Sequence, residues 1–187
     1  MKTYIKDLST HQDSVVTLQG WVQNKRESKG LVFLIIRDGS GFCQCIVDLN
    51  NIGEEQFNKA TSLGQESSLR LTGKVVEDTR QIGGFEMHVQ EIDIIQNCAN
   101  YPIANKEHGI EFLMDQRHLW LRSKRQWAIM RVRNQVIFAI HNFFQKEGFV
   151  QMDAPIFTGN ACEGTTDLFE TDFYGEPAYL SQSGQLY

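Results

Sequence analysis

The chain has 187 residues, enough for one large or two small domains, and its hydrophobic and charged fractions of 41% and 22% are typical of a globular protein. It has no apolar run near the roughly 18 residues of a membrane span and no signal-peptide core, so we expect a cytoplasmic protein with no membrane association. The net charge of −5 argues against a uniformly basic nucleic-acid coat, although phosphate binding depends on local potential rather than total charge.

Up to residue 95 the sequence shows the composition and alternation of β-strands. Asp38–Gly41 has the composition of a hairpin turn, and a short helix is expected at residues 54–63. Three strands, a helix and two strands form the element order of an OB-fold, a small closed barrel. Strands are predicted at residues 15–23, 31–37, 42–49, 68–76 and 85–95, with a charged bend at residues 24–30.

OB-folds bind oligonucleotides across the face formed by strands 2 and 3. On this face we expect Phe33 and Gln44, with Arg26 in the bend before strand 2. An aromatic ring for stacking, an amide for a base edge and a guanidinium for a phosphate or base would together read single-stranded RNA. Phe33 could instead be one more core aromatic, since the chain has 12 phenylalanines.

The four cysteines and five histidines do not form a metal-binding pattern. Cys43 and Cys45 lie two apart in a predicted strand, Cys98 and Cys162 are isolated, and the histidines are scattered without ligand spacing. We therefore expect structural cysteines and no metal site.

A long amphipathic helix is predicted from Ser123 to Glu147. This segment contains no proline or glycine, and its apolar residues recur every three or four positions. Ser123 and Gln126 have the spacing of a capping box, and Gly148 can adopt the left-handed cap that ends a helix. Residues 117–146 carry basic but no acidic side chains, which would give either a local RNA-binding face or a solvated helix surface.

This helix, the glycine after it and the Pro155 segment resemble motif 1 of the class II aminoacyl-tRNA synthetases, which forms the dimer interface in that family. The barrel sequence from Gly20-Trp-Val to Gly41-Phe-Cys-Gln44 resembles the anticodon-binding domain of the class IIb enzymes for aspartate, asparagine and lysine. Arg117-His-Leu-Trp-Leu-Arg122 resembles the hexamer that opens their catalytic domain. The resemblance implies an α+β protein with an OB-fold domain at residues 1–97, a linker at 98–116 and the first part of an antiparallel-sheet catalytic domain at 117–187.

The resemblance also assigns roles to individual residues. Glu163 matches the glutamate that faces the α-ammonium of the amino acid, a sound contact because each charge offsets the desolvation of the other. Ser183 and Gln185 match a serine and a glutamine that a strand and turn present to the bound amino acid. Arg26, Phe33 and Gln44 fall where the family contacts anticodon bases, and Ile140, Phe149 and Pro155 fall in its dimer interface.

Trp120, Cys162 and Ser183-Gly184-Gln185 are nearer to the asparaginyl than to the aspartyl enzymes, whereas Ser181-Gln182 is closer to some aspartyl sequences. The resemblance therefore implies a homodimeric ligase that uses ATP and Mg²⁺ to activate L-asparagine and transfers it to tRNA(Asn). The alternatives are an aspartyl-tRNA synthetase, in a form that accepts both tRNAs, and a free-standing OB-fold RNA-binding protein. The ATP and Mg²⁺ ligands of the family have no counterpart in this sequence. We therefore expect an N-terminal portion of the enzyme that binds the anticodon but does not catalyse.

Overall fold

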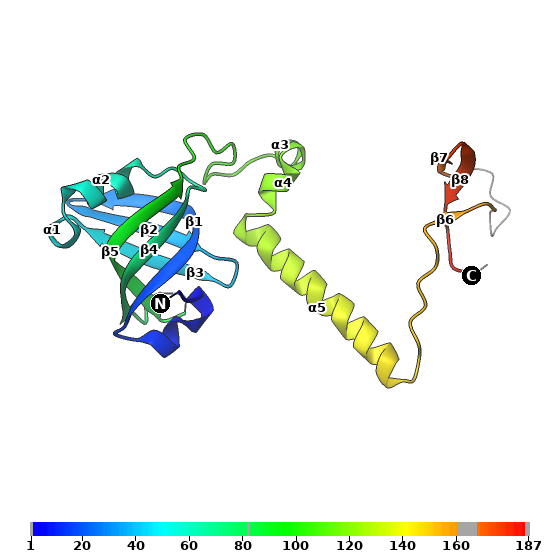
Figure 1. Cartoon of the computed structure of the whole chain (residues 1–187), viewed down its shortest axis with the longest axis horizontal. Helices are drawn as coiled ribbons and strands as arrows, with labels where there is room; N and C mark the ends of the chain where they lie inside the picture. Colours follow the sequence, from blue (N-terminus) through cyan, green and yellow to red (C-terminus); the bar gives the residue numbers. More distant parts are fainter. Residues whose placement is uncertain (1, 82, 161–167, 186–187) are drawn as a thin grey trace. The chain divides into compact units, whose positions relative to one another are not determined.

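The computed structural model describes residues 2–81, 83–160 and 168–185. The chain divides into two compact units, Met1–Trp120 and Leu121–Tyr187. The first unit contains a closed barrel with the strand order β1–β2–β3–β5–β4, visible in Figure 1. This confirms the predicted OB-fold. Its strands are β1 (Val15–Ser28), β2 (Leu31–Arg37), β3 (Phe42–Asp48), β4 (Ser68–Glu77) and β5 (Phe85–Gln96).

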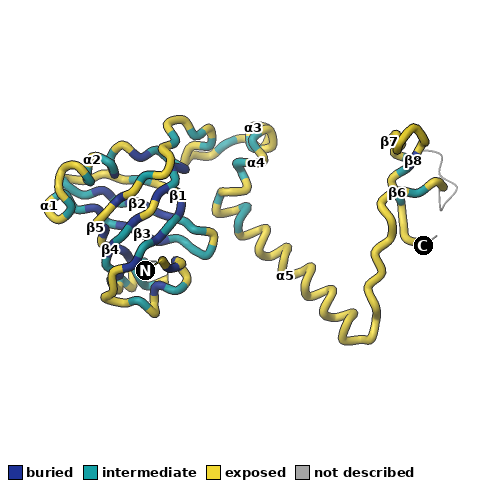
Figure 2. Tube along the Cα trace, viewed as in Figure 1, coloured by how far each residue is buried: buried dark blue, intermediate teal, exposed yellow. Residues whose placement is uncertain are grey.

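The strands β2 and β3 alternate strictly between buried and half-buried residues, so one parity fills the barrel and the other forms its outer face. Figure 2 shows the same alternation along the trace. The 3₁₀ helix η1 (Ile5–His11) and the helix α2 (Glu54–Ser62), which follows the one-turn α1 (Leu49–Ile52), add Ile5, Leu8 and Ala60 to this core.

The thiols of Cys43 and Cys45 lie inside the barrel, as predicted for structural cysteines. A hydrogen bond with Cys43, together with burial, raises the pKa of the Cys45 thiol above its usual range. Cys45 is therefore kept as a neutral thiol.

The charged bend predicted at residues 24–30 is wrong. β1 continues through this stretch as far as Ser28, because Arg26 and Ser28 pair with Phe33 and Leu31 of β2 in a regular antiparallel ladder. The ladder shifts register between Val22 and Asn24, so the strand accommodates an extra residue as a β-bulge. Arg26 therefore lies on a strand, directly opposite Phe33.

Two glycines allow the barrel strands to approach closely where they bend. A Cβ at Gly20 would overlap the carbonyl oxygen of Arg37 on β2, and a Cβ at Gly73 would overlap that of His88 on β5. Gly73 also lies at a register shift between β4 and β5. These are the close backbone contacts for which strands use glycine.

The first unit ends with the short helices α3 (Ile110–Asp115) and α4 (Arg117–Trp120). The second unit begins with α5 (Lys124–Lys146) and confirms the predicted caps: the Ser123 hydroxyl accepts a hydrogen bond from the Gln126 N–H at 3.4 Å, and Gly148 has a φ of +84°. An antiparallel sheet follows, with the order β6–β8–β7. Its strands are β6 (Phe157–Thr158), β7 (Glu170–Phe173) and β8 (Glu176–Leu180).

Candidate nucleic-acid interface

Arg26 and Phe33 form a stacked pair on the outer face of the barrel. The two residues are direct partners in the β1–β2 ladder, and the guanidinium carbon of Arg26 lies 4.7 Å from the centre of the Phe33 ring. The arrangement is a cation–π contact, which fixes the ring and holds a positive charge beside it. Phe33 is half-buried on the outer face, so the reading of Phe33 as a core aromatic is not supported.

Gln44 lies on the same face, on the neighbouring strand. It pairs with Ile35 in the β2–β3 ladder, while Phe33 pairs with Ile46, so Phe33 and Gln44 are diagonal neighbours. The Gln44 amide donates a hydrogen bond from Nε2 to Oε2 of Glu86 at 3.0 Å. This bond fixes the plane of the amide and leaves its carbonyl oxygen to accept from a base N–H.

Glu86 and His88 were not identified from the sequence, yet they extend the same face onto β5. Glu86 is only 7% exposed and bonds Gln44 through one carboxylate oxygen and His88, at 3.1 Å, through the other. They adjoin Gln44 because β3 and β5 pair in parallel at Gln44–Glu86 and Ile46–His88. Glu86 and His88 could be assigned to this face only from the closed barrel topology, because β3 and β5 are about 40 residues apart in the sequence.

The turn between β4 and β5 is held by an ion pair between Asp78 and Arg80. Arg80 donates to the carboxylate from Nε at 2.8 Å and from a terminal nitrogen at 3.0 Å. These bonds lower the pKa of Asp78 to about 2. In OB-folds this turn is one of the two loops that contact nucleic acid, and here it presents a fixed guanidinium.

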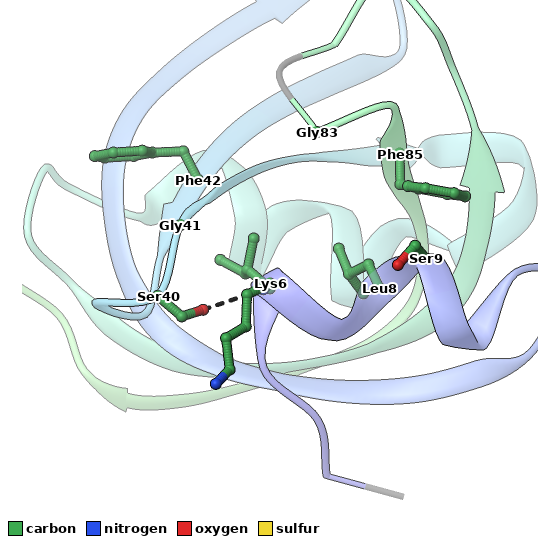
Figure 3. A pocket seen from close by; sticks show the side chains of 9 residues that line it. Lys6, Leu8, Ser9, Ser40, Gly41, Phe42, Gly83 and Phe85 are labelled. Atoms are coloured by element: carbon green, nitrogen blue, oxygen red, sulfur yellow. Dashed lines mark hydrogen bonds between the residues drawn. The ribbon is translucent and has the colours of Figure 1, made fainter.

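A small pocket of about 190 Å³ lies at the end of the barrel, beside the starts of β3 and β5. Figure 3 shows Phe42 and Phe85 on its two sides and the bond from the Lys6 N–H to the Ser40 hydroxyl, 3.1 Å long. Arg26, Phe33 and Gln44 do not line it. This pocket is therefore separate from the Arg26, Phe33 and Gln44 cluster on the outer face.

The second unit carries the predicted amino-acid-binding residues only in part. Ser183 and Gln185 follow β8 in a turn, where the Ser181 hydroxyl donates to the Ser183 carbonyl at 2.7 Å and the Gln185 N–H bonds the Ser183 hydroxyl at 3.4 Å. Glu163 lies outside the described residues. The roles of all three stay predictions.

The predicted interface residues of the second unit are exposed. Ile140 and Phe149 have 52% and 62% of their surface accessible, and Pro155 is exposed as well. They continue an apolar face along α5 and the segment after it, in which Phe144 and Phe149 contact edge to face at 5.4 Å. Contiguous exposed apolar faces are uncommon on monomeric proteins and are typical of interaction surfaces.

Among the described residues, no group of three or more His, Cys, Asp or Glu side chains could hold a metal ion. Within the same ranges, no helix is long and apolar enough to cross a membrane.

The two halves of the chain match two protein families. Residues 16–95 match the OB-fold nucleic acid binding domain, and residues 109–187 match the tRNA synthetases class II (D, K and N). The chain therefore joins an OB-fold nucleic acid binding domain to part of a class II tRNA synthetase domain.

Solved structures agree over the whole chain. Asparaginyl-tRNA synthetase from Pyrococcus horikoshii, complexed with asparaginyl-adenylate, is 37% identical with a TM-score of 0.91, and the enzyme from Entamoeba histolytica, in complex with the same adenylate, is 27% identical with a TM-score of 0.81. Both matches cover 100% of this chain and 44% of the solved chain. A putative aspartyl-tRNA synthetase from Leishmania major Friedlin shares the fold at 20% identity and a TM-score of 0.84, over 100% of this chain and 39% of its own.

The chain belongs to the aspartate, lysine and asparagine group of the class II aminoacyl-tRNA synthetases, and it spans less than half the length of the solved proteins that it matches.

Proposed function

We propose that this chain is part of a cytoplasmic ligase that attaches L-asparagine to tRNA(Asn). The observation that carries the proposal is the outer face of the barrel, where Arg26, Phe33 and Gln44 gather as anticodon recognition requires. The similarity to asparaginyl-tRNA synthetases across all 187 residues supports the choice of amino acid.

In this proposal the barrel binds the anticodon G-U-U. A base stacks on Phe33, the Gln44 amide pairs with the edge of a uracil, and Arg26 contacts a phosphate or a base. The carboxylate of Glu86, held beside Gln44, can accept from the ring N–H and amino groups of guanine. Single-strand readout of this kind needs each of these groups on one surface.

In the second unit, Glu163 faces the α-ammonium of asparagine, and Ser183 and Gln185 contact the rest of its backbone. The bound carboxylate then attacks the α-phosphorus of ATP in line, and pyrophosphate leaves. The asparaginyl group passes from the adenylate to a terminal hydroxyl of tRNA, and AMP leaves. Positioning of the two reactants supplies much of the rate enhancement. The 187 residues would bind the anticodon without catalysing, and we assign no Mg²⁺ ligand to the described residues.

The test is amino-acid-dependent pyrophosphate exchange by a protein that contains this chain and spans the full length of its solved relatives. We expect exchange with asparagine, its loss in Glu163→Ala, and normal exchange in Glu176→Ala, a control that truncates an exposed glutamate of β8. Binding of tRNA should stay near wild type in both variants. Full exchange in Glu163→Ala would show that Glu163 does not contact the amino acid.

Exchange with aspartate in place of asparagine would support the alternative of an aspartyl-tRNA synthetase, which Ser181-Gln182 favours. Charging of both tRNAs with aspartate would identify the form that does not discriminate between them. A protein that shows no exchange with any amino acid, yet binds RNA, would be the free-standing RNA-binding protein.

We also propose that the enzyme is a homodimer, with Ile140, Phe149 and Pro155 in the interface. The support is the exposure of these apolar residues on the second unit. Ile140→Asp should convert the dimer to monomer in sedimentation velocity, because it would bury a charge. Asn142→Asp, two positions along α5 and on another face of the helix, should leave the dimer intact. A monomeric wild-type enzyme would contradict the proposal.

A further inference from the structure

Asn97, the residue after β5, ties the exit of the barrel to the loop between α2 and β4. Its side-chain oxygen accepts hydrogen bonds from the Gly64 N–H at 3.1 Å and the Ser67 hydroxyl at 2.8 Å. Its amide nitrogen donates to the carbonyl of Ser62 at 2.9 Å. One side chain therefore uses both its donor and its acceptor to hold a single loop, residues 62–67.

The same loop holds the first residue of the connector that follows Asn97. The Ser67 side chain is fully buried, and its hydroxyl accepts a hydrogen bond from the Cys98 N–H at 2.9 Å. A Cβ at Gly64 would overlap the Cys98 carbonyl oxygen, so the two backbones are in close contact. Because the buried Ser67 hydroxyl donates to Asn97 and accepts from Cys98, the backbone at these two residues has little freedom to change direction.

The 62–67 loop is itself part of the barrel wall. The Glu66 N–H donates to the Val22 carbonyl at 2.7 Å, and the Val22 N–H donates to the Ser67 carbonyl at 2.9 Å, beside the β1 bulge. The Glu66 carboxylate pairs with Arg37, which is on the outer face of β2 with Phe33. The connector is thus joined through this loop to the strands of the nucleic-acid face.

The connector touches the barrel at a second point. The Asn105 amide donates to the side-chain oxygen of Asn24 at 3.0 Å, and Asn24 lies on β1 two residues before Arg26. Two separate tethers, one at the start of the connector and one further along it, fix a direction where a single tether would leave a pivot.

We propose that Asn97 is a positioning residue, which sets the direction in which the connector leaves the barrel so that a tRNA held at its anticodon delivers its acceptor end to the catalytic domain. The inference rests on the proposed function, because only a substrate that spans both domains makes this direction matter. A displacement of about 1 Å at the reacting atoms can cost on the order of 100-fold in rate. Asn97 contacts no substrate and acts through the connector.

The latch itself can be tested on the present chain, by amide hydrogen exchange followed by NMR. In Asn97→Ala the Cys98 amide should exchange at least about tenfold faster, because Ser67 loses its acceptor, while core amides of β4 and β5 stay protected. Asn97→Asp keeps the acceptor oxygens and should retain part of the protection. Asn100→Ala, an exposed asparagine of the same connector, is the control. Unchanged exchange of Cys98 in Asn97→Ala would overturn the latch.

The positioning role is tested in the longer enzyme by three measurements on the same variants. Asn97→Ala should leave both asparagine-dependent pyrophosphate exchange and the affinity for an isolated anticodon stem-loop as in wild type. It should lower kcat/KM for charging intact tRNA by roughly 10- to 100-fold, with Asn97→Asp in between. Normal charging, or an equal loss of stem-loop binding, would overturn the role. Absence of exchange in the wild-type enzyme would instead refute the proposed function.

Discussion

The proposed stacking of an anticodon base on Phe33 predicts a measurable loss of RNA affinity when the ring is removed. One face of the ring is covered by the Arg26 guanidinium at 4.7 Å, and the residue is half-buried on an otherwise open surface. Stacking of a base on an aromatic side chain is worth about 1–3 kcal/mol by alanine substitution. Arg26 would also lose the ring on which its guanidinium stacks, and a cation–π contact of this kind is worth about 0.5–1 kcal/mol at an exposed site. Phe33→Ala should therefore raise the dissociation constant by roughly 10- to 700-fold.

The assay is fluorescence anisotropy with an anticodon stem-loop that carries G-U-U, at one fixed salt concentration because phosphate contacts are salt-dependent. Phe33→Leu keeps the apolar bulk but removes the π-face, so it should bind nearly as weakly as Phe33→Ala. The matched control is Phe57→Leu, since Phe57 packs against the core from α2. This variant should lower the stability of the barrel and leave the RNA affinity unchanged.

Equal affinities for wild type and Phe33→Ala, with the circular dichroism of a folded barrel, would refute the stacking assignment. An equal weakening in Phe57→Leu would show that binding reports barrel stability rather than contact with the ring.

Two further predictions concern the stability of the barrel. Glu66→Ala removes the partner of Arg37, whose side chain is only 15% exposed, and should cost about 3–5 kcal/mol in the free energy of unfolding measured with urea. Glu66→Gly should cost about 1 kcal/mol less, because Glu66 has a φ of 65° that glycine adopts without strain; equal losses would contradict that reasoning. Asp78→Asn should lower Tm at neutral pH by removing the bonds to Arg80. Because the pKa of Asp78 falls from 3.8 to about 2 on folding, the difference should persist above pH 4 and vanish as pH falls through 2; a constant difference in thermal melts over that range would contradict it.

The faces of the barrel strands could be predicted because alternation with a period of two is a local property of the sequence. Phe33 and Gln44 occupy the alternate positions of β2 and β3 that face outward, and these positions could be predicted from the sequence. The caps of α5 were readable for the same reason, since Ser123 acts on a residue three positions away.

Features that depend on a distant partner were not readable. The second half of β1 has the charged composition of a bend, and only pairing with β2 makes it a strand. Glu86 lies on the outer face because β3 pairs with β5, and no local sequence pattern predicts that pairing. The apolar stripe of α5 predicted a face that packs against another surface, but a stripe does not identify the segment or protein that packs on it.

The short parallel ladder between β3 and β5 has a consequence for how the barrel folds. Gln44 and Glu86 meet only when the ends of the five-stranded sheet join, a contact between residues 42 positions apart. Such non-local pairing requires loop closure before its contacts contribute, which makes it slower to form than a hairpin. A barrel that has formed its hairpins but not the β3–β5 pairing would have Phe33 in place beside Arg26. The Gln44 amide would not yet be oriented by Glu86. RNA that binds only the closed barrel would stabilise the closed barrel by mass action. The ligand would therefore strengthen the β3–β5 pairing that forms part of its own binding site.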